Sequence, residues 1–161
     1  MGSSSPSKRR LNAVETFGSA KEALGTLEKG MSVFGVTRGQ FSMIDILLVL
    51  IEFLGSAEVS VWTWAIADYE VEVFSGLMQR KEIRSARLVV DHSADRRNRD
   101  LLNQWRALYG AESVKVCLNH SKIARVTGGD YRFLVRGSMN LNFNPRFEQF
   151  DLTEGGADHD L

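Results

Sequence analysis

Residues 85 to 119 read SARLVVDHSADRRNRDLLNQWRALYGAESVKVCLN, and this stretch decides the fold class. Residues 85–91 and 113–119 are rich in aliphatic and β-branched side chains, a composition that favours strands. Residues 94–109 lie between them, carry apolar side chains at helical spacing and stop at Gly110. A strand, a helix and another strand in this order predict two parallel strands joined by a helical crossover.

The same alternation continues on both sides of this segment. Toward the N-terminus, apolar periodicity and turn residues predict a helix at 14–29, a strand at 31–37, a helix at 43–54 capped by Ser42, a strand at 58–66 and a helix at 68–82. Toward the C-terminus they predict short strands at 123–126, 131–136 and 147–152, with a turn at Gly128-Gly129. The sequence therefore predicts an α/β fold with a mixed, largely parallel sheet flanked by helices.

Composition limits the class of protein. The chain has 161 residues, of which 43% are hydrophobic and 25% charged, as in an ordinary globular domain. Cys117 is the only cysteine, which excludes an internal disulfide framework and zinc sites that need several thiolates, and favours a cytoplasmic location. The longest apolar stretch, residues 43–54, contains Asp45 and Glu52 and is shorter than the roughly 20 residues of a membrane-spanning helix. We therefore expect no membrane contact.

The domain organisation follows from the ends of the chain. Residues 1–12 are rich in serine and then basic, which predicts a flexible tail and no secretory signal. Residues 13–152 form one expected domain, and residues 153–161 an acidic flexible tail that contains His159.

Charge is distributed unevenly, although 20 basic and 20 acidic residues cancel over the whole chain. Residues 80–136 hold 13 basic and 6 acidic groups, whereas the segments before and after them are net acidic. A concentrated positive charge suits a polyanionic partner such as nucleic acid. The candidate phosphate contacts are Arg96, Arg97, Arg99, Arg125, Arg132 and Arg136. Solvation of a helix face is the alternative reading of the first three arginines.

Two short motifs in the last third of the chain carry the chemistry. After the strand at 113–119 the sequence reads His120-Ser121-Lys122, and in an extended segment the first and third side chains share a face. Residues 137–140 read Gly-Ser-Met-Asn and supply a hydroxyl at Ser138 and an amide at Asn140. A hairpin between the two motifs would bring them together. An imidazole can attack phosphorus, while a lysine and an amide stabilise the charge on the phosphate oxygens.

These motifs resemble the signature of the phospholipase D superfamily, which combines HxK, an aspartate and GSxN. The segment Asn144-Pro145-Arg146-Phe147-Glu148 adds the downstream carboxylate that is common in the family. The order of strands and helices in residues 31–119 is similar to that of the family fold as well. The resemblance implies a phospholipase D-like fold with one motif copy in each chain.

The resemblance also implies a metal-independent phosphodiesterase with no cofactor and a phosphohistidine intermediate. His120 would be the nucleophile or the general acid, Lys122 and Asn140 would bind the phosphate with support from Ser138, and Glu148 would orient the partner histidine. Family enzymes use two motif copies around one site, so a second subunit must supply the other copy. We therefore expect a homodimer with the site on its two-fold axis, and a nuclease acting on DNA or RNA.

The sequence departs from the family at one position and leaves alternatives open. The family aspartate would stand at position 127, where this chain has Thr127, and Asp130 follows after the glycine pair. A catalytically inactive module that binds nucleic acid or serves a structural role is therefore the main alternative. A phospholipid head-group hydrolase ranks below both, because no amphipathic basic helix is evident. Trp62, Trp64 and Trp105 are expected in the core or at the dimer interface.

Overall fold

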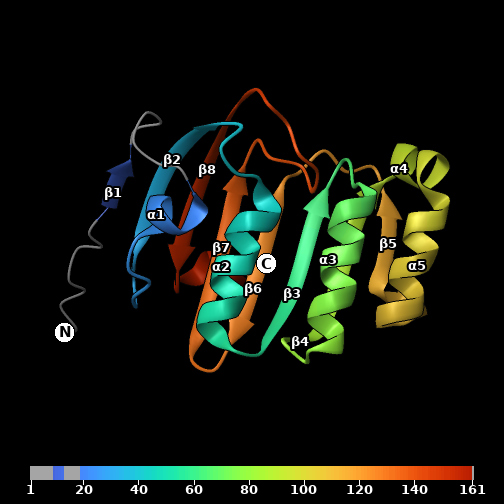
Figure 1. The fold of residues 1–161 in the computed structure, drawn as a ribbon, viewed down its shortest axis with the longest axis horizontal. Coiled ribbons are helices and arrows are strands. Elements are labelled where there is room, and N and C mark those ends of the chain that lie inside the picture. The colour runs from blue at the N-terminus through green and yellow to red at the C-terminus, as the bar shows by residue number, and fades with distance from the viewer. Residues whose placement is uncertain (1–8, 13–18, 161) are drawn as a thin grey trace.

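The computed structural model describes residues 9–12 and 19–160. Helices cover one face of a single open sheet (Figure 1). The strands are β1 Arg9–Asn12, β2 Ser32–Arg38, β3 Ala57–Thr63, β4 Ile83–Asp91, β5 Val114–Cys117, β6 Ile123–Gly128, β7 Tyr131–Gly137 and β8 Phe147–Glu154. The helices are α1 Ala20–Leu24, α2 Met43–Leu54, α3 Asp68–Gln79, α4 His92–Arg97 and α5 Arg99–Tyr109, with the 3-10 helices η2 Ala111–Ser113 and η3 Ala157–Asp160.

The sheet order is β1-β2-β8-β7-β6-β3-β4-β5. The pairs β1·β2, β3·β4 and β4·β5 are parallel, and the other four pairs are antiparallel. The α/β class and the mixed sheet are confirmed, but the expectation of a largely parallel sheet is wrong. The C-terminal strands β6, β7 and β8 insert between β2 and β3, and the tight connection between β6 and β7 makes that pair antiparallel.

The helix α2 shows how local sequence sets an element. Its bounds, Met43–Leu54, are those that the sequence predicts. The helix begins there because the backbone N–H and the hydroxyl of Ser42 both donate to the Asp45 carboxylate. Gly55 ends the helix at φ 70°, a left-handed conformation that glycine adopts without strain. Half of the α2 side chains are buried in the hydrophobic core between the helix layer and the sheet. None of the helices in the described part of the chain is long and apolar enough to cross a membrane.

The predicted helix at 94–109 is interrupted. Asn98 leaves the helical conformation at φ −127° and ψ 35°, and separates α4 from α5. Its side-chain amide donates to the carbonyl of Ile66 at 3.0 Å, which anchors the break to the segment that follows β3. The helix predicted at 14–29 is described only from residue 19 onward, where α1 is short.

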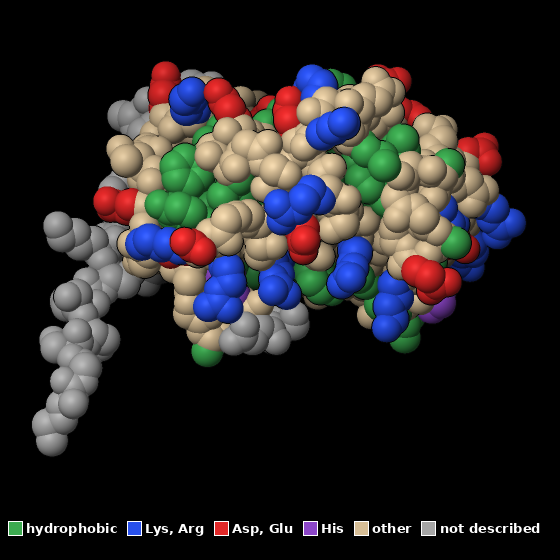
Figure 2. All heavy atoms as spheres, turned by 90° about the horizontal axis from the view of Figure 1, so that it is seen from below, with side chains coloured by type: hydrophobic (Ala, Val, Ile, Leu, Met, Phe, Trp, Pro, Cys, Tyr) green, Lys and Arg blue, Asp and Glu red, His purple; other side chains and the backbone are tan. Residues whose placement is uncertain are grey.

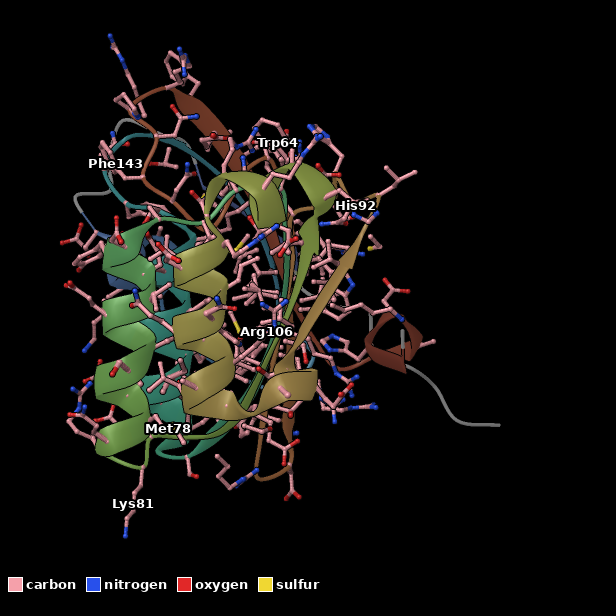
Figure 3. All side chains as sticks on the ribbon, turned by 90° about the vertical axis from the view of Figure 1, so that its right-hand side faces the viewer. Trp64, Met78, Lys81, His92, Arg106 and Phe143 are labelled. Carbon is pink, nitrogen blue, oxygen red and sulfur yellow. The ribbon has the colours of Figure 1, made fainter. Side chains whose placement is uncertain are left out.

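The C-terminal segment differs from the acidic tail expected for residues 153–161. β8 continues to Glu154, whose carboxylate accepts hydrogen bonds from the backbone N–H groups of Gly30 and Arg132. η3 then lies on the sheet face opposite the helices, as the side view shows (Figure 3), and buries His159 completely. At the other end, residues 1–8 of the expected tail lie outside the described residues, and β1 pairs with β2.

Candidate active site

The candidate site lies at one end of the sheet, where β3, β4 and β5 finish and β8 begins (Figure 1). The β6–β7 hairpin pairs Ile123 with Arg136, and the Gly137 N–H donates to the carbonyl of Lys122 at 3.2 Å. The two motifs therefore meet as the hairpin argument predicts, although the turn falls at Gly129-Asp130, one residue later than expected.

His120 and Lys122 lie side by side at this end. The Lys122 ammonium is 3.3 Å from His120 Nδ1, 3.5 Å from Nε2 and 2.7 Å from the His120 carbonyl oxygen. Burial lowers the pKa of Lys122, and the nearby Glu148 carboxylate opposes that shift. The ammonium lies at nearly equal distances from the two ring nitrogens, so lysine and imidazole can contact the same bound phosphate.

Asn119 fixes the backbone that carries this pair. Its buried side-chain amide donates to the carbonyls of Thr63 at 3.1 Å and Val89 at 3.4 Å, on two neighbouring strands. Its Oδ1 accepts from the Ser121 N–H at 3.2 Å. Asn119 thus connects the motif to β3 and β4, a role that the sequence analysis missed because the partners are distant in the chain.

Ser138 and Glu148 form the second half of the site. The Ser138 hydroxyl donates to Glu148 and accepts from the Gln149 N–H at 3.0 Å. Asn144 donates to the other Glu148 oxygen at 2.7 Å, so the carboxylate closes the loop between β7 and β8. Within this chain, the Glu148 oxygens bind these two side chains and not His120.

Gly137 precedes Ser138 where β8 passes closest. A Cβ at Gly137 would overlap the carbonyl oxygen of Gln149 and lie 3.0 Å from its carbon. The glycine is therefore required by the close approach of the two backbones, which also places the Ser138 N–H 3.1 Å from that carbonyl.

Asn140 is anchored to the end of β3. Its Oδ1 accepts from the Trp64 N–H at 3.1 Å, and the next residue, Leu141, donates its N–H to the buried Thr63 hydroxyl at 2.9 Å. The amide nitrogen on the other branch of the Asn140 side chain is the group that can donate to a bound phosphate. Thr63 and Trp64 are further residues that the motif search did not identify.

Trp64 connects one of the predicted arginines to the site. The Arg97 guanidinium lies 4.7 Å from the centroid of the Trp64 ring, and that ring lies 6.0 Å from the His120 ring. Figure 3 shows Trp64 and His92 at the same end of the sheet. Trp105 is fully buried in the core, which is one of the two places expected for the tryptophans. Trp64 instead borders the site.

The six candidate arginines fall into two groups. Arg96, Arg97 and Arg99 follow β4 at the site, on α4 and at the start of α5. Arg125, Arg132 and Arg136 lie on β6 and β7, and strand register places them on the sheet face that η3 packs against. Arg136 binds Asp151 at 3.3 Å and Asp158 at 3.1 Å, so it is engaged within the chain.

Position 127, where the phospholipase D signature has an aspartate, lies away from the site. Thr127 pairs with Glu58 and Arg132 on the neighbouring strands. Asp130 occupies the hairpin turn at the far end of β6, whose six residues span roughly 20 Å at about 3.3 Å each. Asp130 therefore does not lie at the site. Among residues 9–12 and 19–160, no group of three or more metal-ligating side chains is present.

Comparisons with known proteins give distant structural similarity but no match in sequence. No family model matches the chain, and no curated protein matches it. The chain is similar to a crystal structure of a mutant of yeast tyrosyl-DNA phosphodiesterase 1, with a TM-score of 0.42 and 11% sequence identity. The match covers 78% of this chain and 32% of that chain, so this chain spans about a third of the length of that structure. The similarity is too low to assign a family or an activity.

Proposed function

We propose that this chain is a metal-independent phosphodiesterase of the phospholipase D type. Within that class we propose a nuclease that works through a phosphohistidine in a site shared by two subunits. The observation that carries the proposal is the convergence of His120, Lys122, Ser138 and Glu148 at one end of the sheet, from separate motifs. The single reduced cysteine, Cys117, suits the cytoplasm as its compartment.

The reaction requires two transfers at phosphorus. A nitrogen of His120 attacks the phosphate, the P–N bond forms, the P–O bond to the leaving strand breaks, and that oxygen takes a proton from a second histidine. Water then attacks the phosphohistidine, the P–N bond breaks, and the second histidine takes a proton from the water. Lys122 and the Asn140 amide stabilise the negative charge on the non-bridging oxygens throughout.

The second histidine comes from another copy of the chain. Leu118 lies two residues before His120 and is 89% exposed, the largest exposed fraction among the large apolar side chains of the described residues. Contact with a second copy would remove this side chain from water. A two-fold axis beside His120 would cover Leu118 and bring the two imidazoles to one phosphate.

Nucleic acid is the substrate that the surroundings favour. Arg97 and Trp64 stand beside His120 and combine a phosphate contact with an aromatic surface on which a base can stack. Arg96 and Arg99 extend the positive charge along the same end of the sheet. A single-stranded segment can present both a base and a phosphate to these groups.

Cleavage of labelled DNA and RNA, each single- and double-stranded, tests the proposal in excess EDTA. We expect wild type to cleave at least one substrate and His120→Ala to lose at least 100-fold in rate, because the nucleophile is gone. His92→Ala is the matched control, since His92 is exposed near the same end but belongs to neither motif. Cleavage that EDTA abolishes, or that survives in His120→Ala, would contradict the proposal.

Thr127 favours a second candidate, an inactive module that binds nucleic acid. In that case wild type, His120→Ala and His92→Ala would all bind labelled strands in a salt-dependent manner, and none would cleave them.

Analytical ultracentrifugation tests separately whether two subunits share the site. We expect a dimer at micromolar concentration and a monomer for Leu118→Glu, and a monomeric wild type would exclude the two-subunit mechanism.

A further inference from the structure

One face of the sheet lacks a helix layer in the described residues. The helices lie on the opposite face, and only η3 packs here (Figure 3). Strand register places Trp62, Ile123 and Arg136 in one row across β3, β6 and β7, next to a row that holds Arg125 and Leu134. Figure 2 shows Lys and Arg side chains in a row toward this face.

A pocket of about 250 Å³ lies between η3 and this face. Its walls are mainly apolar, formed by Trp62, Ile123 and Leu134, and its polar groups come from Ser121, Arg125, Asp158 and His159. The volume equals that of roughly eight water molecules at about 30 Å³ each, which corresponds to a ligand of about ten non-hydrogen atoms.

The pocket contains buried polar groups without partners. His159 is fully buried, and neither of its ring nitrogens has a hydrogen-bond partner among residues 9–12 and 19–160. Arg125 Nε is also buried and unpartnered, and the Arg125 guanidinium forms no ion pair within the described residues. Asp158 is the acidic residue of the lining, and it is bound to Arg136 at 3.1 Å. Because buried polar groups are normally paired, these nitrogens are donors that a bound acceptor would satisfy.

The donors and the walls define the ligand. Arg125 Nε–H and a ring N–H of His159 are both donors that an acceptor on the ligand can satisfy. The positive charge of Arg125 favours an anionic acceptor. The indole of Trp62 and the aliphatic walls suit a flat apolar body. We propose that this pocket binds a small aromatic anion, whose carboxylate or phosphate accepts hydrogen bonds from Arg125 and His159 while its ring packs on Trp62.

The pocket is separate from the catalytic proposal and does not depend on it. Ser121 nevertheless stands between His120 and Lys122 in the chain, so a ligand in the pocket touches the same segment from the other side. Burial and the positive charges of Arg132 and Arg125 lower the pKa of His159, against Glu154 and Asp158. A bound anion would favour the protonated ring, so binding should become tighter as the pH falls from 7.5 to 5.5.

Titration of the full chain followed by NMR of the tryptophan indole N–H groups tests the proposal. The probes are benzoate, phenyl phosphate, the neutral isostere benzamide and inorganic phosphate. We expect saturable binding of benzoate or phenyl phosphate, and at least tenfold weaker binding of benzamide and of inorganic phosphate. Tighter binding of benzoate would identify a carboxylate as the natural group, and tighter binding of phenyl phosphate a phosphate ester.

Variants locate the site. Arg125→Gln and His159→Phe should weaken binding at least tenfold. Arg87→Gln should change it less than twofold, because Arg87 lies on the same face in the row of Arg125 but two strands away, with Ser60 between them. If His159→Phe unfolds, Arg125→Gln alone decides, since its side chain reaches solvent in part. Absence of saturable binding by both aromatic anions at 20 mM, or unchanged binding in Arg125→Gln, would overturn the proposal.

Discussion

Replacement of Asn119 should loosen the end of the sheet that carries the candidate site. Asn119→Ala removes two donor bonds to the carbonyls of Thr63 and Val89 and one acceptor bond from the Ser121 N–H. Each such bond contributes about 0.5–1.5 kcal/mol, and their loss leaves partly buried backbone groups unpaired. We therefore expect the free energy of unfolding to fall by about 3 kcal/mol.

Urea denaturation followed by circular dichroism measures this loss. With a slope of about 2 kcal/mol/M for a domain of this size, the midpoint should fall by about 1.5 M. Lys115→Ala is the matched control, because this side chain on β5 is exposed and its loss should change stability by at most about 0.5 kcal/mol. A loss below about 1 kcal/mol in Asn119→Ala, or an equal loss in the control, would refute the reasoning.

Three further predictions concern Gly137, Trp105 and His159. Gly137→Ala should destabilise the protein by about 2–4 kcal/mol and abolish cleavage, because the new Cβ overlaps the Gln149 carbonyl; near-wild-type melting and activity would contradict the close approach. Trp105→Ala should lower the free energy of unfolding by about 3–5 kcal/mol, as expected for a fully buried aromatic residue, and Trp105→Phe by less, because Phe also removes the unpartnered indole N–H. The pKa of His159 is lowered in the folded state, so unfolding takes up a proton and stability is lost as the pH falls through about 6.5. Urea midpoints at pH 7.5 and 5.5 should therefore differ more in wild type than in His159→Phe, and equal differences would show that His159 does not contribute.

Elements with local signals could be predicted from the sequence. The bounds of α2 follow from Ser42, Asp45 and Gly55, which lie within or beside the helix itself. The interruption at Asn98 could not be predicted, because its partner is the carbonyl of Ile66, 32 residues away. The position of β8 beside β2 is likewise a long-range choice, and it converts the expected largely parallel sheet into one with a mostly antiparallel centre.

The same distinction applies to the site. The sequence predicts that one hairpin places His120, Lys122 and Ser138 close together, because its two strands begin and end at these motifs. The contacts of Asn119 with Thr63 and Val89 involve strands far away in the chain, so no local pattern points to them. Ion pairs explain why Arg136 differs from its prediction. The sequence predicts a cation that can contact phosphate, whereas in the fold Arg136 binds two aspartates.

Trapping of the covalent intermediate tests the central claim most directly. The generic phosphodiester bis(4-nitrophenyl) phosphate is mixed with the protein in EDTA, quenched within one turnover without acid, and analysed by intact mass and peptide mapping. The account predicts one 4-nitrophenolate released for each phosphoryl adduct, with the adduct on the peptide that contains His120 and none in His120→Ala. Turnover without an adduct on His120, or an adduct that persists in His120→Ala, would contradict it.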